Sequence, residues 1–479
     1  MNLVHILRRS LPGILAGVLA LAVCGVGGVA AQSGDGVVEA YVKLNSPNAS
    51  CETLSQALAG NAEPVPDCKV IHRASSTLRL RWSATTAARV EALLLNWKST
   101  GLIAWFEFKG EVLRTQSLAG VGAVTEYANY AATLRPQAAA QGDPNFVSEP
   151  LRRLRTLLDL YDVRPEVVVA VIDSGVNFDS PELAAMRWHN AKELAGNGKD
   201  DDGNGYIDDV QGWDFVDGGA FAYSDDVTVP DNDPSDHLGH GTVIATIIEK
   251  TLGEHARGLV KIMPLRVASG VYGTGSVSPG ALAEAIYYAV DNGAKVVNIS
   301  VGGTETYAVI QAAIEYGLAK GVLFVAAAGN SGGAVYFPAR IPGVLAIGAV
   351  DEAGAIWSGS AIGEGVDVFA QGTNMLVGLG VTAPNLSASG TSYAAPVVTA
   401  ASAMLIALLS GEDASCSQGR TVLGQYKPLG QDVPGWLVYH VNRFESGLVG
   451  KEALRAKWLA GGNVCGATVT VNALLRRPG

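Results

Sequence analysis

The feature that most limits the fold of this chain is a repeated alternation of short apolar stretches with longer stretches of helical character. The apolar stretches are residues 167–173, 259–267, 294–301, 321–327 and 344–350, and the helical ones are residues 279–292 and 307–320. Short apolar runs without polar alternation are typical of parallel strands that are buried on both faces. The sequence therefore predicts an α/β fold, a doubly wound parallel sheet with helices on both faces. A length of 479 residues exceeds what one core usually holds and indicates more than one structural unit.

Three short segments carry the residue types of a nucleophilic hydrolase. They are AVIDSG around Asp173, DHLGHGT around His240 and SASGTSYAAP around Ser392. A fourth segment, AAAGN, places Asn330 between the last two. Nucleophile, base and base-orienting carboxylate are the three groups that acyl transfer by a hydroxyl requires. Taken singly, each residue also has a structural interpretation, as a helix cap, a turn residue or a structural histidine.

The neighbours of these residues predict where each one lies. Asp173 ends an apolar strand, and the carboxyl ends of the strands are where open α/β sheets bind ligands. An apolar run follows His240, so we expect a helix to begin there. Ser392 precedes a longer apolar stretch and is expected at a helix N-terminus, where unpaired N–H groups and the helix dipole favour an oxyanion. We expect Pro396 in the first turn, where a missing N–H costs little.

Together and in this order, the segments resemble the subtilisin-like serine peptidases, or subtilases. The resemblance covers residues 143 to 454. It implies a subtilisin-like sheet and a catalytic triad of Asp173, His240 and Ser392. In this scheme Asp173 orients His240, and His240 takes the proton from Ser392. Asn330 donates to the tetrahedral oxyanion together with the backbone N–H of Ser392.

The same resemblance implies where an extended peptide binds. AKVVNISVGG and GVLFVAAAGN resemble the segments that flank the pocket for the primary substrate side chain, and GVYGTGSVS resembles the glycine-rich strand that pairs with the peptide. The pocket lining is small and has no acidic anchor, which favours an apolar or mixed preference at the residue before the cut. The implied substrate-binding residues are Ser300, Val301, Gly302, Gly303, Ala327, Gly329 and Gly273.

The first residues have the pattern of an export signal. Arg8 and Arg9 precede an apolar, glycine-rich stretch, and small residues at 29–31 form an acceptable cleavage site. We therefore expect a signal peptide at 1–31 and a secreted or periplasmic protein. The alternative is an uncleaved membrane anchor, since the stretch is nearly long enough to span a bilayer. A membrane contact is expected only through the uncleaved signal segment.

The pattern changes between residues 36 and 115, where strand-like and helix-like stretches follow one another in a small α+β unit whose last expected strand covers residues 102–114. Its order and position resemble the ferredoxin-like pro-region of subtilases, which assists folding and occupies the active site until it is removed. The alternative is an unrelated binding module. Residues 116–142, rich in Ala and Gly, are the expected linker in which maturation cuts the chain. Residues 143–460 are then the peptidase domain, and 461–479 a C-terminal tail.

Cysteine usage agrees with export. One of the five cysteines lies in the signal segment, and the other four form two local pairs, Cys51 with Cys68 and Cys416 with Cys465. Four cysteines allow three connectivities, which the sequence does not distinguish. Cleavage between the pro-region and the mature enzyme favours the local pairs, because other pairings would leave the two parts tethered. The alternative is buried free thiols.

One insertion is strongly acidic. Residues 200–236 contain twelve Asp and no Lys or Arg, so the net charge of −11 arises there and the rest of the chain is close to neutral. This charge distribution gives no reason to expect nucleic acid as a partner. The spacing of DDDGNGYIDD matches an EF-hand-like loop with Gln211 in place of the bidentate Glu. The expected Ca²⁺ ligands are Asp200, Asp202, Asn204, the carbonyl of Tyr206, and Asp208. The alternative is an acidic solvated loop with Asx turns.

The sequence thus predicts a secreted serine endopeptidase that forms an acyl-enzyme and is made as a self-processed precursor. Its expected partners are polypeptide substrates and its own pro-region, which inhibits it intramolecularly. Catalysis by this triad needs no cofactor, and calcium is expected as a structural ion. The alternative is a catalytically silent secreted protein that uses the same scaffold to bind peptides or another partner.

Overall fold

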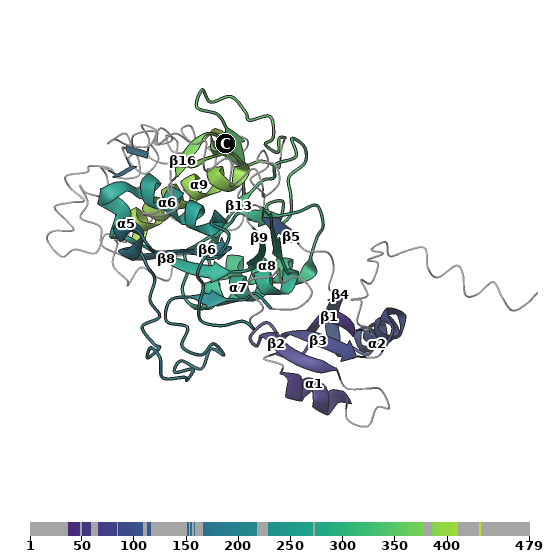
Figure 1. The fold of residues 1–479 in the computed structure, drawn as a ribbon. Helices are drawn as coiled ribbons and strands as arrows, with labels where there is room; N and C mark the ends of the chain where they lie inside the picture. Colours follow the sequence, from purple (N-terminus) through teal and green to yellow (C-terminus); the bar gives the residue numbers. More distant parts are fainter. Residues whose placement is uncertain are drawn as a thin grey trace, which may run out of the picture.

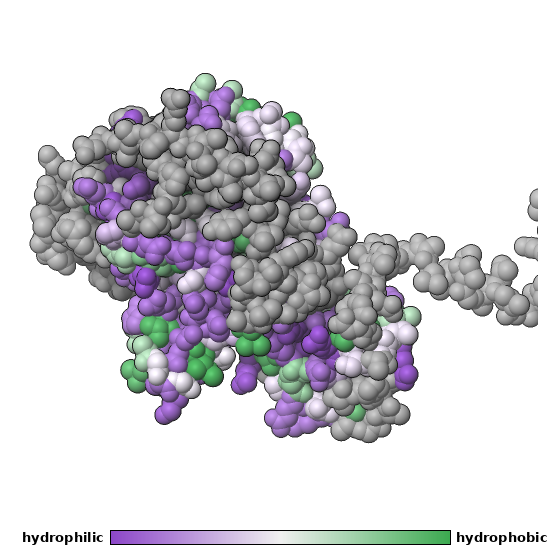
Figure 2. Space-filling view, in the orientation of Figure 1, coloured by the Kyte–Doolittle hydropathy of each residue, from purple (hydrophilic) through white to green (hydrophobic). Residues whose placement is uncertain are grey.

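The protein is described from a computed structural model. The described residues are 37–47, 50–58, 66–83, 85–108, 113–115, 151–152, 154–155, 158, 166–217, 229–271, 274–363, 365–377, 386–410 and 431–432. The predicted signal peptide, the linker 116–142 and the tail 461–479 lie outside them. In the described part of the chain, no helix has both the length and the apolar character that crossing a bilayer requires. On the face drawn in Figure 2 the described surface is mostly hydrophilic, with hydrophobic residues in small groups.

The larger unit is built on a parallel sheet in the order β18-β15-β14-β13-β11-β6-β8-β7. In chain order its strands are β6 (Val167–Asp173), β7 (Trp213–Asp214), β8 (Val260–Arg266), β11 (Val296–Ile299), β13 (Leu323–Ala327), β14 (Leu345–Val350), β15 (Val368–Gln371) and β18 (Gln431–Asp432). A hairpin of β16 (Met375–Val377) and β17 (Leu386–Ala388) lies outside this sheet. The predicted α/β fold with a parallel sheet is confirmed.

Helices cover both faces of this sheet (Figure 1). Helices α6 (His240–Arg257) and α9 (Thr391–Ser410) pack on one face, with the short α5 (Pro181–Ala184) beside α6. Helices α7 (Pro279–Asp291) and α8 (Ala308–Ala319) pack on the other. Along β6, Val169 and Val171 join the first core while Ala170 and Ile172 join the second. Burial on both faces is the reason that β6 is apolar throughout, and each fully buried Val or Ile contributes about 1.5–3 kcal/mol.

The smaller N-terminal unit has the element order β-α-β-β-α-β. Its elements are β1 (Val37–Leu44), α1 (Cys51–Leu58), β2 (Asp67–His72), β3 (Thr77–Ser83), α2 (Ala87–Ser99) and β4 (Ile103–Phe108). The strands form an antiparallel sheet in the order β2-β3-β1-β4, with a separate hydrophobic core. A disulfide of 2.06 Å joins Cys51 to Cys68, so this predicted pair is confirmed. Cys416 and Cys465 lie outside the described residues.

The last strand of the N-terminal region departs from the prediction. The sequence pattern indicates one strand over 102–114, but β4 ends at Phe108 and a separate strand, β5 (Leu113–Thr115), follows. Strand β5 is not part of the N-terminal sheet. It pairs antiparallel with β10 (Thr274–Val277) on one side and with β12 (Val301–Gly302) on the other. Strand β10 pairs in turn with β9 (Ala268–Val271). This pairing depends on the edges of β10 and β12, which lie far along the chain, so the local pattern around β5 does not reveal it.

The N-terminal unit packs against α7 and α8 of the larger unit (Figure 1). Tyr41 and Ile71 are buried in the same core as these helices. The carboxylate of Glu107 on β4 accepts hydrogen bonds of 2.9 and 3.1 Å from the N–H groups of Ala308 and Val309, at the N-terminus of α8. Burial raises the pKa of Glu107, although these two bonds act in the opposite direction. A carboxylate of the small unit therefore caps a helix of the large one.

Candidate active site

Two of the three predicted catalytic residues are directly hydrogen-bonded. Asp173 is the last residue of β6 and His240 the first of α6. His240 Nδ1 lies 2.7 Å from Asp173 Oδ1, and both residues are buried. Burial lowers the pKa of His240, but the adjacent Asp173 and the charge of Asp236 outweigh it, so the pKa is raised above its ordinary value. The Nε2 atom of His240 is buried and has no hydrogen-bond partner, which leaves it able to accept a proton.

The third residue, Ser392, is the second residue of α9, as expected for a nucleophile at a helix N-terminus. Its Oγ donates to the carbonyl of Ser300 at 3.2 Å. Pro396 is not in the first turn, because α9 begins at Thr391 and Pro396 is inside the helix. A proline there removes the helical hydrogen bond to the carbonyl of Ser392. That carbonyl instead accepts a 3.0 Å hydrogen bond from Ser300 Oγ, which ties the nucleophile to the segment between β11 and β12.

Asn330 has the geometry of an oriented donor. Its Oδ1 accepts from both the N–H and the Oγ1 of Thr391, at 2.9 and 2.8 Å, so the amide orientation is fixed by the residue before Ser392. Its Nδ2 is buried and has no partner. A Cβ added to Gly390 would lie 3.2 Å from that nitrogen, which shows how close Nδ2 is to the nucleophile segment. An unpaired buried donor beside a nucleophile fits stabilisation of an oxyanion.

The predicted substrate-binding residues fall on two neighbouring strand ends. Ser300, Val301, Gly302 and Gly303 follow β11 and include β12, while Ala327 ends β13 and Gly329 follows it. Gly329 has a φ of 121° and is packed against Tyr336, so a side chain at this position would be strained and crowded. Gly273 lies outside the described residues.

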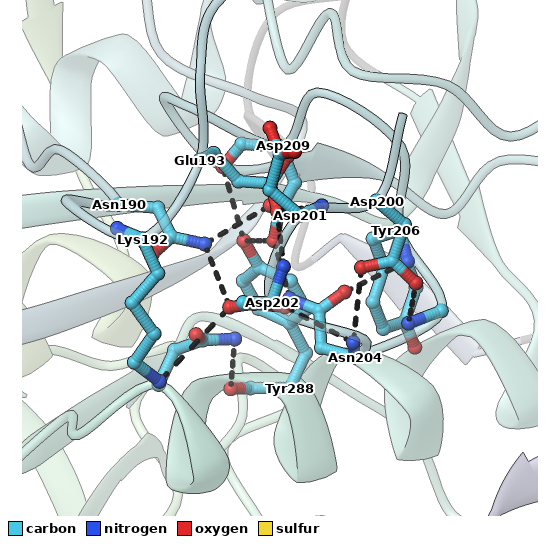
Figure 3. A network of polar contacts seen from close by, with 12 residues as sticks. Asn190, Lys192, Glu193, Asp200, Asp201, Asp202, Asn204, Tyr206, Asp209 and Tyr288 are labelled. Atoms are coloured by element: carbon cyan, nitrogen blue, oxygen red, sulfur yellow. Dashed lines mark hydrogen bonds and ion pairs between the residues drawn. The ribbon is translucent and has the colours of Figure 1, made fainter. Parts of the chain in front are cut away.

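The acidic insertion forms a second candidate site (Figure 3). Carboxylate oxygens of Glu193, Asp200 and Asp202 lie within 4.8 Å of one another. Glu193 is only 4% exposed, and while its Oε1 accepts from the N–H groups of Asp201 and Asp202, its Oε2 is buried without a partner. A buried carboxylate that has an unpaired oxygen and lies close to two other carboxylates is costly unless a cation balances the charge.

Only part of the predicted EF-hand-like ligand set comes together here. Asp200 and Asp202 converge, but Asp208 accepts from the N–H groups of Asn197 and Gly198. The Oδ1 of Asn204 accepts from the N–H of Tyr206. Glu193, which the sequence analysis did not include, takes the third place, because the chain folds back across the loop.

The loop is joined to α7 through Asp209. Its carboxylate accepts from the side-chain amides of Asn190 and Asn204, at 3.0 and 2.9 Å, and from the hydroxyl of Tyr288 on α7. The ring of Tyr206 packs against Trp213, Phe215 and Tyr288, with centroids 5.0 to 5.7 Å apart. These aromatic contacts and the hydrogen bond from Tyr288 therefore hold the acidic loop against α7.

Comparisons with known proteins agree with this architecture. The sequence model of the subtilase family matches residues 164–422, more than half of the chain. A thermophilic serine proteinase from Bacillus sp. (strain AK1) is 33% identical over 243 residues, which cover 50% of this chain and 51% of that protein. Thermitase from Thermoactinomyces vulgaris is 32% identical over 244 residues, covering 50% of this chain and 74% of thermitase.

A solved structure described as a cold adapted subtilisin-like serine proteinase matches with 28% identity and a TM-score of 0.37. The match covers 51% of this chain and 75% of that one. The chain spans about half the length of the Bacillus relative. Fold and site define an α/β protein with an Asp-His pair, a helix-start serine and an oriented amide at one edge of a parallel sheet. With the family match, the conclusion is that the chain belongs to the subtilase family.

Proposed function

We propose that this protein is a secreted serine endopeptidase that hydrolyses peptide bonds through an acyl-enzyme and is made as a self-processed precursor. The observation that carries the proposal is the buried Asp173–His240 pair with an unpartnered Nε2. It occurs in a chain of the subtilase family that also places Ser392 at the start of α9 and leaves the Nδ2 of Asn330 unpaired.

In the proposed reaction, His240 Nε2 takes the proton of Ser392 as its Oγ attacks the substrate carbonyl. Asp173 holds the imidazole in the tautomer with Nδ1–H and stabilises the imidazolium that forms. Asn330 Nδ2 and the backbone N–H of Ser392 donate to the developing oxyanion. One such donor is worth roughly 2.7–4 kcal/mol in the transition state. The protonated His240 then gives its proton to the leaving amine, and water hydrolyses the acyl-enzyme.

The proposed substrate is an extended polypeptide that adds a strand between β10 and β12. Support comes from β5, which occupies that position: Arg114 pairs with Ser276 on one side and with Gly302 on the other. Main-chain pairing of this kind supplies affinity that depends little on side chains. A strand of the chain itself at the substrate position also supports the proposed intramolecular inhibition by a ferredoxin-like pro-region, residues 36–115.

The test compares the wild-type precursor with Ser392→Ala by intact mass and casein hydrolysis. We expect the wild type to lose the N-terminal region and digest casein, and the variant to do neither. If both proteins stay full length and inert under oxidising conditions with added Ca²⁺, the peptidase proposal is wrong and a peptide-binding role is favoured. Peptide-library profiling with a strong preference for Arg or Lys before the cut would overturn the expected apolar or mixed preference.

We also propose that the acidic insertion holds a structural Ca²⁺ ion. The carboxylates of Glu193, Asp200 and Asp202 supply the hard oxygen ligands that Ca²⁺ prefers. A bound ion would neutralise the unpaired oxygen of Glu193 and fix the loop on α7. Binding to the folded state alone stabilises by about 2.7 kcal/mol at a hundredfold excess over Kd.

Glu193→Gln and the matched control Glu305→Gln test this site, since Glu305 is exposed and is not part of the insertion. We expect added Ca²⁺ to raise the Tm of the wild type and the control above its value in chelator, and to raise that of Glu193→Gln much less. An equal response of all three proteins would place the ion elsewhere. No response in any of them would leave the insertion an acidic solvated loop.

A further inference from the structure

Asp236 is a buried carboxylate close to the candidate triad that neither the catalytic scheme nor the cation site uses. It lies four residues before His240 and is 8% exposed. Its Oδ1 accepts from Ser174 Oγ and from the N–H groups of Leu238 and Gly239, at 2.8 to 2.9 Å. Its Oδ2 accepts from the N–H and the Oγ1 of Thr242, at 2.8 and 2.6 Å.

All of these neighbours are donors. Ser174 Oγ accepts from the N–H of Gly241, so its own proton goes to Asp236. Thr242 Oγ1 likewise accepts from the N–H of Asn177 and donates to Asp236. Burial raises the pKa of the Asp236 carboxyl, but the hydrogen bonds from these donors act in the opposite direction and favour its ionised form.

The contacts join the two elements that carry the Asp-His pair. On one side, Ser174 follows Asp173 at the end of β6, and its N–H donates to Asp173 Oδ1 at 2.8 Å. On the other, Gly239 and Thr242 flank His240 at the start of α6, where the N-cap glycine offers no side chain of its own. The backbones meet closely at this point, since a Cβ on Gly241 would lie 2.1 Å from the carbonyl oxygen of Gly175.

From this geometry we infer that Asp236, acting through Ser174, is a positioning residue for the catalytic pair. Its carboxylate holds the end of β6 and the start of α6 in the register that places His240 Nδ1 against Asp173 Oδ1. Its role differs from that of Asp173, because it does not contact His240 or the reacting atoms. The inference rests on the proposed peptidase activity.

Asp236→Asn keeps the shape but turns one acceptor into a donor. If the amide oxygen of the new Asn faces Ser174, its NH₂ group faces the N–H of Thr242. Two donors then oppose each other, and the start of α6 loses the acceptor that caps it. Misplacement of a catalytic group by about 1 Å costs roughly a hundredfold in rate. We expect kcat per titrated active site to fall by about 10- to 100-fold with KM within about twofold. Losing the nearby negative charge also lowers the pKa of His240, so the acid limb of kcat/KM moves to lower pH.

Ser174 provides a second test that leaves the cap of α6 in place. Ser174→Ala removes the link between β6 and Asp236 and should lower kcat, whereas Ser174→Thr retains the hydroxyl and should restore it. Asp233→Asn is the matched control, because Asp233 is exposed in the same segment and bonds only locally. We expect it to leave kcat and the pH profile unchanged. If Asp236→Asn does not fold, the comparison of kcat between Ser174→Ala and Ser174→Thr tests the inference.

A merely structural role predicts a different result. In that case Asp236→Asn and Ser174→Ala lower Tm, while kcat per active site and the acid limb match the wild type, and the inference is overturned. An NMR titration of the His240 ring is a readout independent of activity. If the wild type is inert but the His240 pKa still drops in Asp236→Asn, the proposed function fails and the coupling of Asp236 to His240 stands. If the His240 pKa is unchanged as well, both fail.

Discussion

His72 of the N-terminal unit is the residue whose removal should most clearly weaken the contact between the two units. Its ring stacks on Tyr287 of α7, with centroids 4.0 Å apart and planes 9° apart. Its Nδ1 accepts from the N–H of Ser75, so Nε2 carries the proton that is donated to Asp291 at 2.8 Å. His72→Ala removes both contacts with α7 and leaves the core of the N-terminal unit unchanged.

The magnitude follows from these contacts. A stacked aromatic pair contributes about 0.5–1.5 kcal/mol. A hydrogen bond to a carboxylate contributes more when buried, but the Asp291 side chain is 40% exposed, so solvent screening reduces this one to about 1 kcal/mol. The sum is about 2 kcal/mol, which corresponds to roughly 30-fold weaker binding.

The assay measures inhibition of the mature enzyme by residues 36–115 added separately. That unit has its own core and a disulfide, so we expect it to fold alone. Arg73→Ala is the matched control, since Arg73 is the exposed neighbour of His72. A double-mutant cycle with Asp291→Asn isolates the contribution of the hydrogen bond between His72 and Asp291. If His72→Ala and Arg73→Ala change the inhibition constant equally, the reasoning from stacking and hydrogen bonding is refuted.

The pH dependence of the same inhibition follows from Asp291. Burial raises its pKa, but hydrogen bonds from His72, Tyr316 and Lys320 and the charge of His72 outweigh this and hold the pKa at about 2. Tyr316 and Lys320 belong to the same unit as Asp291, so only the part of this shift that comes from His72 depends on the contact between the units. That part stabilises the contact where Asp291 is ionised and is lost as the pH falls towards 2. Asp291 should therefore leave inhibition constant above about pH 5 and weaken it between about pH 4 and 2, with a smaller loss in His72→Ala.

Three other predictions concern the active site, the disulfide and maturation. Asn330→Ala should lower kcat by about 100- to 1,000-fold with KM little changed, as steady-state kinetics on a peptide substrate will show. Cys68→Ser opens a loop with a sequence separation of 17 and should lower the free energy of unfolding of the isolated N-terminal unit by about 3 kcal/mol in urea titrations. Because β5 occupies the proposed substrate position up to Thr115, intact mass should place the first maturation cut shortly after that residue, and a cut inside β4 would contradict the register.

The fold was predictable where local pattern and burial coincide. Strand β6 is buried on both faces, so its unbroken apolar run identified both the strand and its end at Asp173. The apolar runs that follow His240 and Ser392 likewise identified α6 and α9. Pro396 shows the limit of such reasoning. The sequence does not show that α9 begins at Thr391. The lost hydrogen bond is compensated by Ser300, which lies between β11 and β12 and is far from α9 in the sequence.

Residues that depend on chain reversal could not be placed from spacing. Asp200 and Asp202 satisfy an EF-hand-like spacing, but the oxygen that completes their cluster belongs to Glu193, which precedes that pattern. Asp208 fits the pattern and yet bonds to a different turn. Asp236 is the first residue of the DHLGHGT segment. Its only sequence signal was an acidic residue shortly before a helix start, which is too common to indicate a positioning role.

Helix α7 shows why prediction of an element does not extend to its contacts. The apolar pattern predicted the helix, but its polar residues serve two different surfaces. Glu284, Tyr287 and Asp291 follow one another at spacings of three and four residues, share a face, and meet Lys69 and His72 of the N-terminal unit. Tyr288, the residue after Tyr287, lies on another side of the helix and donates a hydrogen bond to Asp209 in the acidic insertion. A rotation of about 100° per residue thus lets one helix carry the docking surface for the proposed inhibitor and the support of the proposed cation site. Only the packed structure shows which residue does which.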